Sequence, residues 1–491
     1  MVIGRVTQNS VVYATVLLAG CASMALEMAA ARLYAPYLGA SLYIWGGLIS
    51  VVMAAMAIGY ALGGHFADRA QDKRALFWVL LASGLYQIAM MFAAQPLLLA
   101  TTEWSEAVAV LLVSCVLFAP PVALLAAIGP LAVQELADER HLGRAAGRVF
   151  AISTIGSIAG VLVASFWLLP TYGTHQTRIG LCVMTMLASL LGLVAIRKTA
   201  FLAGAAGALL FFVPTPDWGK DTIWVGESAY NLVRVVERHG QRQLILDQHN
   251  GSHGSTVHST RLTQAYWDVF AAGPLLTDAS SALVLGLGAG TSVHTLWRAN
   301  PEISVDAVEI DPLVVEVAER FFELTPSPKL TIHTEDARRH LRTSRKHYDI
   351  VQVDLFHHGP HVPFHLATAE FFSEIAEHLN KSGVLMMNVV DPSKDQQLLG
   401  SFVASLRETF PTVLGTRVSA ANHILLAFPL ATTVGNARAR LRTPPASLRR
   451  TIVGFRAGLR EYESGSLVMR DDKAPIEALT RTAMRQPERL P

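Results

Sequence analysis

The sequence predicts a multi-span α-helical membrane domain followed by an α/β Rossmann-like domain that begins with a small antiparallel β-sheet. Charged residues are sparse up to residue 213, with 11 Lys and Arg and 8 Asp and Glu, whereas the remaining 278 residues carry 29 and 30. Residues 282–311 have the pattern of a strand, a glycine-rich turn, a helix and a second strand that ends in acidic residues. That order is typical of a nucleotide-binding βαβ unit.

Charge and cysteine content exclude some classes of function. The net charge is +2 and is close to zero in both parts of the chain, so nothing indicates a nucleic acid partner. Cys21, Cys115 and Cys182 all lie in apolar stretches, so we expect neither a disulfide framework nor thiol chemistry in the later part. The first apolar run is too long for the core of a cleavable signal peptide.

Six apolar segments are long enough to cross a bilayer, which requires about 20 residues each. They are residues 11–31, 42–64, 75–100, 107–133, 149–169 and 178–196. A seventh segment, 201–213, is too short to be assigned. Two Gly-x-x-x-Gly pairs, Gly59 with Gly63 and Gly156 with Gly160, indicate either close helix contacts or only the small residues common in membrane helices.

Positive charges in the loops predict the orientation. They gather in alternate loops, as Arg69, Lys73 and Arg74, then Arg140, Arg144 and Arg148, then Arg197 and Lys198. Loops rich in Lys and Arg stay in the cytoplasm. The side of the later domain then depends on residues 201–213, which we expect not to cross fully. We therefore predict an integral protein of a bacterial-type inner membrane, with the lipid bilayer as its partner and the α/β domain in the cytoplasm.

Glu27 lies inside the first apolar segment and is a candidate functional residue. An intramembrane carboxylate marks a substrate path, a proton relay or a hydrogen bond between helices. The loop after the second segment, with Gly64, Asp68 and Arg69, resembles the cytoplasmic loop motif of major facilitator transporters. Six segments are half the number in those transporters, so transport remains an alternative and not a conclusion.

Composition and pattern divide the later part into four pieces. We expect a linker at 214–222, a small β-sheet domain at 223–260, the Rossmann-like domain at 261–430 and a basic helical tail at 431–491, which follows the membrane domain at 1–213. Short β-rich runs at 223–225, 230–237 and 243–247 predict the antiparallel sheet. An amphipathic helix is expected at 262–275. Strands then alternate with helices, which predicts a doubly wound parallel sheet, and two late strands at 413–418 and 423–428 form an antiparallel edge.

Candidate site residues stand where strands end. Gly286, Gly288 and Gly290 follow the first buried strand, and glycine at such a turn lets the backbone approach a ligand closely. Glu309 ends the next strand, 21 residues after Gly288, at the spacing of an acid that accepts hydrogen bonds from a ribose. Asp354 follows the apolar strand 348–353, at the edge where open α/β sheets bind their ligands.

Several longer motifs carry a resemblance to a known family. They are Ser228-Ala-Tyr230, Gly-Leu-Gly-Ala-Gly-Thr from Gly286, Val-Glu-Ile-Asp ending at Asp311, Glu335-Asp336-Ala337, Tyr348 through Asp354, and Leu366-x-Thr368-x-Glu370-Phe371-Phe372. With them, the later part resembles the spermidine synthase family of aminopropyltransferases. Glu27 to Arg32, the loop at Gly64 to Arg69, and Asp471 to Glu477 are similar to segments of the members fused to a membrane domain.

The resemblance implies an activity and a role for each matched residue. In that family, decarboxylated S-adenosylmethionine donates its aminopropyl group to an amine such as putrescine, for polyamine biosynthesis, and methylthioadenosine is released. By resemblance, the three glycines lie against the nucleoside, Glu309 holds the ribose, and Asp336 accepts from the adenine amino group. Asp354 is the base that takes the proton of the attacking amine, and Tyr230 shapes the acceptor site.

Three departures from the family pattern leave the substrates open. Ala289 stands where the family has an acid that holds the donor's amine, and His357 stands in place of a second acid after Asp354. Asn231 replaces a glutamine after the tyrosine. Alternatives are therefore an S-adenosylmethionine-dependent methyltransferase on the same fold, and a non-catalytic transporter or sensor that binds polyamine or nucleoside.

Four histidines gather after Asp354, at positions 357, 358, 361 and 365. A metal site needs three or four ligands that converge, and Pro360 and Pro363 make this segment a loop. We expect it to form a polar lid over the site, with His357 in contact with substrate and no bound metal. A homo-oligomer is compatible with the sequence, which does not determine it.

Overall fold

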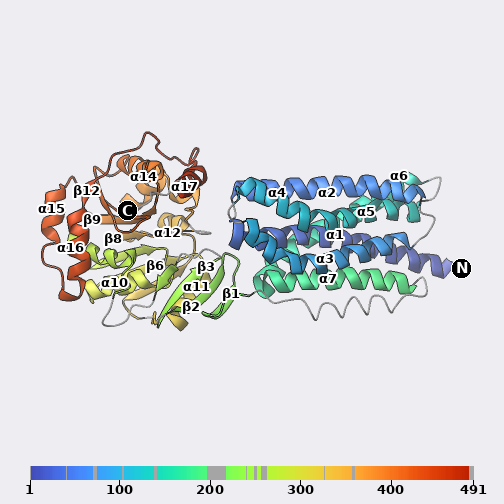
Figure 1. The fold of residues 1–491 in the computed structure, drawn as a ribbon, viewed down its shortest axis with the longest axis horizontal. Coiled ribbons are helices and arrows are strands. Elements are labelled where there is room, and N and C mark those ends of the chain that lie inside the picture. The colour runs from blue at the N-terminus through green and yellow to red at the C-terminus, as the bar shows by residue number, and fades with distance from the viewer. Residues whose placement is uncertain are drawn as a thin grey trace. The chain divides into compact units, whose positions relative to one another are not determined.

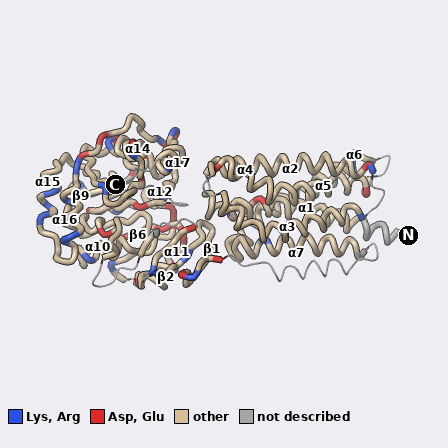
Figure 2. Tube along the Cα trace, viewed as in Figure 1, with Lys and Arg blue, Asp and Glu red and all other residues tan. Residues whose placement is uncertain are grey.

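The structure, a computed structural model, divides into two compact units, Met1–Gly219 and Lys220–Pro491. It describes residues 2–39, 41–69, 74–101, 104–137, 141–195, 217–238, 240–247, 252–255, 262–325, 327–356 and 360–485. The marginal segment 201–213 and His357 lie outside these residues. Lys, Arg, Asp and Glu residues are concentrated in the second unit, whereas most helices of the first unit carry few of them (Figure 2).

The first unit is a bundle of long helices (Figure 1). They are α1 (Val2–Leu38), α2 (Leu42–Arg69), α3 (Ala75–Thr101), α4 (Glu106–Leu117), α5 (Ala119–Leu136), α6 (Leu142–Val163), a π-helical segment η1 (Ala164–Leu168) and α7 (Leu169–Ala195). Among the described residues, five helical stretches are long and apolar enough to cross a membrane: Asn9–Leu38, Leu42–Arg69, Ala75–Thr101, Ala119–Leu136 and Leu142–Leu193. The bundle therefore has the lengths and composition that the sequence predicted for a membrane domain.

Three predicted segments differ in detail from the observed helices. The segment expected at 107–133 is broken at Phe118 into α4 and α5, because Pro120 and Pro121 follow and lack the N–H groups that would continue the first helix. The segments at 149–169 and 178–196 fall in one stretch, Leu142–Leu193, which Gly173 interrupts with a φ of 73°. A residue at that φ cannot belong to a right-handed helix, so the chain changes course there.

Both Gly-x-x-x-Gly pairs lie at close helix contacts. A Cβ atom added at Gly156 or Gly160 would collide with the backbone of α1, at the carbonyls of Leu17 and Cys21. Added at Gly59, it would collide with the backbone of α5 at Ala123. The absence of a side chain thus brings α6 against α1 and α2 against α5.

The second unit begins with the small antiparallel sheet, in the order β1 (Thr222–Glu227), β2 (Leu232–Arg238), β3 (Gln241–Leu246) and β4 (Ser252–Ser255). Alternate residues of its central strands, Val233, Val235 and Leu244, are buried and form a cluster with Val314 and Val317 of a following helix. Because side chains alternate between the two faces of a strand, one face of this sheet packs against the helix that carries Val314 and Val317.

An eight-stranded sheet follows, in the order β12-β10-β11-β9-β8-β5-β6-β7. Its strands are β5 (Ser281–Leu285), β6 (Ser304–Glu309), β7 (Leu330–Thr334), β8 (Tyr348–Val353), β9 (Leu379–Val390), β10 (Thr412–Arg417), β11 (Asn422–Phe428) and β12 (Arg460–Glu461). Strands β5 to β9 pair in parallel, whereas β10, β11 and β12 form antiparallel pairs. This confirms the predicted Rossmann-like sheet with an antiparallel edge.

Helices cover both faces of this sheet (Figure 1). They are η3 (Tyr266–Ala272), α9 (Gly273–Thr277), α10 (Thr291–Ala299), α11 (Pro312–Phe321), α12 (Ala337–Thr343), η4 (Phe364–Leu366), α13 (Ala369–Glu377), α14 (Gln397–Arg407), α15 (Val434–Arg440), η5 (Ala446–Leu448), α16 (Arg449–Gly458) and α17 (Ile476–Arg485). Because both faces are covered, the apolar run Ala282–Leu285 is at most 1% exposed.

The amphipathic helix expected at 262–275 is not one helix. The chain forms the 3₁₀-helix η3 and then the short α9. The Asp268 carboxylate accepts hydrogen bonds from the backbone N–H groups of Thr263 and Gln264 at 3.1 and 2.7 Å, and Gln264 has a φ of 61°. These local bonds compete with helical ones, so the first turn forms a loop instead.

Candidate active site

A cavity of about 370 Å³ lies at the carboxyl ends of β5, β6, β7 and β8. From β5 the chain adds β6 and β7 on one side and later β8 and β9 on the other, so the order reverses next to β5. Open α/β sheets bind ligands at such a reversal. The volume is in the range of small-molecule sites. The lining includes six of the predicted residues, namely Tyr230, Gly286, Gly288, Glu309, Asp336 and Asp354.

The glycine turn after β5 has the backbone that only glycine adopts readily. Gly286, Gly288 and Gly290 have φ of 91°, 53° and 74°. A Cβ at Gly286 would collide with the carbonyl oxygen of Asp354, so this glycine permits the turns after β5 and β8 to touch. Gly286 and Gly288 line the cavity, whereas Gly290 begins α10 and packs against Leu324. Two of the three glycines therefore face the site, and the third shapes the turn.

Glu309 ends β6 and points its carboxylate at the glycine turn. Its Oε2 accepts from the backbone N–H of Gly288 at 3.2 Å, and its Oε1 accepts from the N–H of Asp311 at 3.1 Å. Burial raises the pKa of Glu309 to about 7, although these backbone bonds act in the opposite direction. Each carboxylate oxygen keeps a further lone pair, so the group can also accept hydrogen bonds from two hydroxyls of a ligand.

Asp311 has a structural role in the same motif. It starts α11 by accepting from the N–H of Leu313 at 2.9 Å. Its fully buried carboxylate also accepts from Ser228 Oγ at 2.6 Å and from Asn231 Nδ2 at 2.9 Å. These bonds fix the turn between β1 and β2, which carries Tyr230 into the cavity wall. Asn231, which stands where the family has a glutamine, thus holds the turn between β1 and β2 in place through Asp311.

Asp336 lies directly after β7 and caps the start of α12. Its Oδ1 accepts from the N–H of Arg339 at 2.9 Å, and its Oδ2 is 3.4 Å from Nε2 of His365. The hydrogen bond from His365 is the main reason that the pKa of Asp336 lies below its usual range. An ionised acceptor therefore stands at the cavity wall, as expected for a group that receives hydrogen bonds from an adenine amino group.

Asp354 ends β8 and is held from two sides. Its Oδ2 accepts from the hydroxyl of Tyr266 at 2.9 Å, and its Oδ1 accepts from Nδ2 of Asn388 at 3.0 Å. Asn388 is oriented in turn by Nδ2 of Asn422 at 3.1 Å. Burial raises the pKa of Asp354 to about 6, and the bonds from Asn388 and Tyr266 act against that rise. The carboxylate is thus oriented, and it is a stronger base than an exposed aspartate.

Neither Tyr266 nor Asn388 was predicted from the sequence to be a site residue. Tyr266 lies in the segment expected to be an amphipathic helix, a pattern that marks no residue as part of a site. Asn388 is 2% exposed within the otherwise apolar run of β9. A lone amide in a strand buried on both faces is a signal of a hydrogen-bonding task, because a buried polar group needs a partner.

The late acidic motif reaches the same region. Asp471 accepts from both Nη atoms of Arg338 at 2.7 Å and from Oγ1 of Thr368 at 2.7 Å. Arg338 is 6% exposed, and it also binds Glu374 and the carbonyl oxygen of His365. The tail therefore supports the segment that brings His365 to Asp336.

The environment of Ala289 explains one departure from the family pattern. Ala289 is 1% exposed, and a Cβ atom added at Gly254 of β4 would collide with it. The backbone of Ser255 also exchanges hydrogen bonds with Thr291 at 2.9 Å in both directions. Strand β4 thus covers the glycine turn where the family has an acidic side chain, and an acid at 289 would displace it.

Comparison with known proteins agrees with this geometry. Residues 265–421 match the family described as Spermine/spermidine synthase domain. A probable polyamine aminopropyl transferase of Bifidobacterium longum is 32% identical over 199 residues, which cover 40% of this chain and 43% of that protein. A polyamine aminopropyltransferase of Vibrio vulnificus is 40% identical over 115 residues, 23% of this chain and 38% of that protein.

A relative with another name also matches part of the chain. The eEF1A lysine and N-terminal methyltransferase of Mus musculus is 29% identical over 153 residues, 29% of this chain and 22% of that protein. The chain spans less than half the length of each of these three relatives. The motifs, the fold and the cavity agree with the family match, and residues 265–421 of the α/β unit are similar to the spermine/spermidine synthase domain.

Proposed function

We propose that the protein transfers an aminopropyl group from decarboxylated S-adenosylmethionine to an amine. The observation that carries the proposal is the position of Asp354, a partly buried carboxylate with a raised pKa, in one cavity with Glu309 and Asp336. Glu309 would accept from the ribose hydroxyls and Asp336 from the adenine amino group. The sulfonium end of the donor then lies toward Asp354, Tyr230 and Tyr266.

The reaction needs a neutral amine. A primary amine has an ordinary pKa near that of lysine, about 10.4, so it enters the site as an ammonium. Asp354 attracts the ammonium and then accepts its proton. The amine nitrogen attacks the propyl carbon bonded to sulfur, the carbon–sulfur bond breaks, and its electron pair stays on the sulfur of neutral methylthioadenosine. Atoms and charges balance in this step without a further reactant.

One observation favours a second candidate, transfer of a methyl group from S-adenosylmethionine. Position 289 holds a buried alanine under β4, so the turn presents no acid to the amine of the donor tail. A methyltransferase is also among the relatives of this chain. In that reaction the same base and the same nucleoside contacts would serve, and S-adenosylhomocysteine would leave.

Product analysis separates these functions. The purified full-length protein is incubated with each donor and a mixture of di- and triamines, and the nucleoside product is identified by mass. Methylthioadenosine, formed only from the decarboxylated donor and only with an amine, is the expected result. S-Adenosylhomocysteine would establish the methyltransferase instead. Binding of nucleoside or polyamine with no product from either donor would leave a transporter or sensor.

We infer that the first unit lies in the membrane and that the α/β unit faces the cytoplasm. Long apolar helices and the loops rich in Lys and Arg support this orientation. The donor is made in the cytoplasm, so a working site should be there. A reporter enzyme fused after Thr222 should be active only in its cytoplasmic form. Activity of a periplasmic reporter at the same junction would contradict the orientation.

A further inference from the structure

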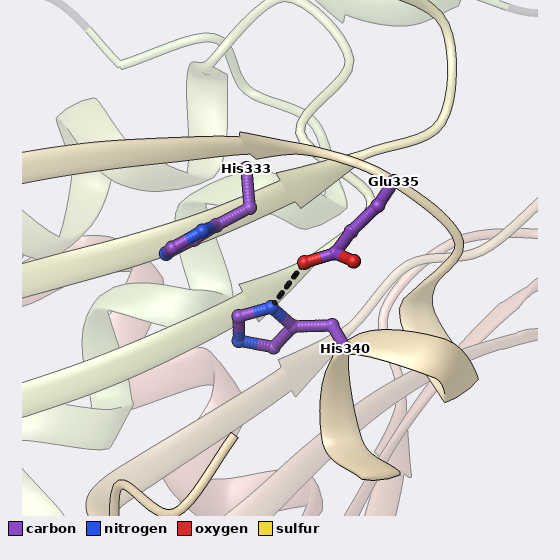
Figure 3. A group of neighbouring side chains, drawn as sticks. All are labelled: His333, Glu335 and His340. Carbon is purple, nitrogen blue, oxygen red and sulfur yellow. Dashed lines mark hydrogen bonds and ion pairs between the residues drawn. The ribbon is translucent and has the colours of Figure 1, made fainter. Parts of the chain in front are cut away.

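Three possible metal ligands converge at the end of edge strand β7. His333 lies in β7, Glu335 follows the strand, and His340 lies in α12. The two rings and the carboxylate face one another (Figure 3). One ligand atom from each residue lies within 4.8 Å of the others, and the carboxylate Oε1 of Glu335 is 2.9 Å from Nδ1 of His340. Asp336, which lines the cavity, is the next residue along the chain.

One ring nitrogen of each histidine at this place lacks the partner that the fold supplies to other buried histidines. His378 contacts the carbonyl oxygens of Lys346 and Leu341 at 2.8 and 2.7 Å, one with each ring nitrogen. His423 likewise contacts the hydroxyl of Tyr462 and the carbonyl oxygen of Asp391. In contrast, Nε2 of His333 and Nε2 of His340 are buried and have no partner among the described residues.

An unpartnered nitrogen inside a folded domain is costly, because water has been removed and nothing replaces it. The side chain of His340 is only 6% exposed, and the centroid of its ring is 4.5 Å from that of His333. Packing alone does not account for two polar edges brought together in this way. A cation bound by the two rings and the carboxylate would supply the partner that Nε2 of each histidine lacks.

The surroundings allow a cation to enter and to stay. The carboxylate side chain of Glu335 is 29% exposed, so the cluster is open to solvent on one side. The charge of Lys346, which acts on His333, is balanced because its Nζ contacts Asp306 Oδ2 at 2.7 Å. Two imidazoles and a carboxylate are a ligand set of Zn²⁺, with bonds of about 2.0–2.2 Å.

We propose that His333, Glu335 and His340 bind one divalent transition-metal ion of the Zn²⁺ class. The ion would join β7 to α12 across the turn that holds Asp336. Among the described residues, none of the three ligands is hydrogen-bonded to Asp354, and Glu335 lines the cavity beside Asp336, so we assign the ion to the support of the nucleoside-binding edge and not to the transfer step. This site is also distinct from the histidines after Asp354 that the sequence analysis considered, and it does not depend on the proposed transferase activity.

The test is a metal titration of the full-length protein without a histidine tag. The protein is treated with a chelator and titrated with Co²⁺, whose visible bands report ligation, and then with Zn²⁺ in competition. We expect one tightly bound equivalent. Removal of even an outer-shell partner of a metal ligand weakens affinity by about 10–100-fold, so His333→Ala and His340→Ala should each weaken binding at least tenfold. His347→Ala, an exposed histidine nearby, is the matched control and should bind as the wild type does.

A second measurement distinguishes loss of the metal site from loss of folding in a variant. Zn²⁺ should raise the temperature at which the wild-type α/β unit unfolds, and it should leave that of His333→Gln unchanged. Absence of Co²⁺ bands at one equivalent would overturn the proposal. Equal affinity in the wild type, His333→Ala and His340→Ala would also overturn it, because the ion would then be bound elsewhere.

Discussion

The two units use the same residue type for opposite purposes. In the helical bundle, Gly156 and Gly160 remain helical, and the missing side chain lets α1 come close. In the α/β unit, Gly286 and Gly288 have positive φ, and the same missing side chain permits a turn that a larger residue would strain. The spacing of glycines alone therefore does not show whether they serve a close helix contact or a turn with positive φ. The surrounding sequence distinguishes the two, because the first kind lies within an apolar helix and the second follows the end of a strand.

The polar groups that a function would use also differ between the units. In the bundle, Arg178 is 4% exposed, and its Nε and Nη2 have no hydrogen-bond partner among the residues described. At the cavity, the partly buried Asp354 and Glu309 each accept two hydrogen bonds, whereas Nε2 of His333 and Nε2 of His340 elsewhere in the described α/β unit have no partner. The hydrogen bonds at the cavity fix the positions of the two carboxylates. Changes at the cavity should therefore affect turnover and binding, whereas changes in the bundle should affect its stability.

The largest effect is expected from Asp354→Asn. This change keeps the shape of the side chain but removes the base, and general base catalysis is typically worth about 10²–10⁴-fold. Turnover should fall at least about a hundredfold while donor affinity, measured by calorimetry, changes little. The exposed Asp395→Asn is the control. A folded Asp354→Asn protein with near wild-type turnover would refute the proposed mechanism.

Next in size is the effect of Glu309→Ala on donor affinity. Hydrogen bonds to a charged group contribute about 1.5–3 kcal/mol, so binding should weaken roughly tenfold to a hundredfold. The exposed Glu316→Ala on α11 serves as the matched control. Unfolding of the bundle in detergent should be the same in all three proteins. If Glu309→Ala binds the donor normally, the glycine turn does not hold a nucleoside in the proposed way.

A pair of glycine variants tests the contrast between the units directly. Gly286→Ala places a side chain at a φ of 91° and against the carbonyl of Asp354, and such strain costs about 1–3 kcal/mol. It should weaken donor binding. Gly160→Val overpacks the contact with α1, which also costs about 1–3 kcal/mol, and it should lower the unfolding temperature of the bundle without changing donor affinity.

Gly64→Ala is the control for this pair. Gly64 lies in α2 with open space around its Cα, so alanine should stabilise the helix by about 0.5–1 kcal/mol. Equal effects of Gly286→Ala and Gly160→Val on donor binding would contradict the division of roles between the units.

The smallest effect is a dependence of donor affinity on pH. The pKa of Glu309 is raised to about 7, so the carboxylate that accepts hydrogen bonds from the donor is ionised above that pH. It becomes protonated, and loses this capacity, as the pH falls through about 7. Each unit below the pKa should weaken binding by up to about tenfold. Glu309→Gln, which does not titrate, should bind weakly but with a flat profile from pH 6 to 8. A flat profile in the wild type would show that Glu309 is already ionised or makes no contact.

The sequence by itself determined the division into apolar and charged parts, the parallel strands, and the acids that end them. These follow from local chemistry: an apolar run of 20 residues, a strand buried on both faces, or a glycine turn can be recognised from neighbours along the chain. Gly286, Glu309 and Asp354 were found in this way because each stands at the end of a strand, and parallel strands end at one edge.

Only the tertiary structure decided how the site is completed. Tyr266 and Asn388 meet Asp354 from segments 88 and 34 residues away, and Asp471 reaches Arg338 across 133 residues. Asp311 resembled a ligand-binding acid but proved to hold Ser228 and Asn231. No periodic pattern encodes such pairs. Long-range contacts are selected when the whole sheet closes, because burial then requires each polar group to find a partner wherever the chain supplies one.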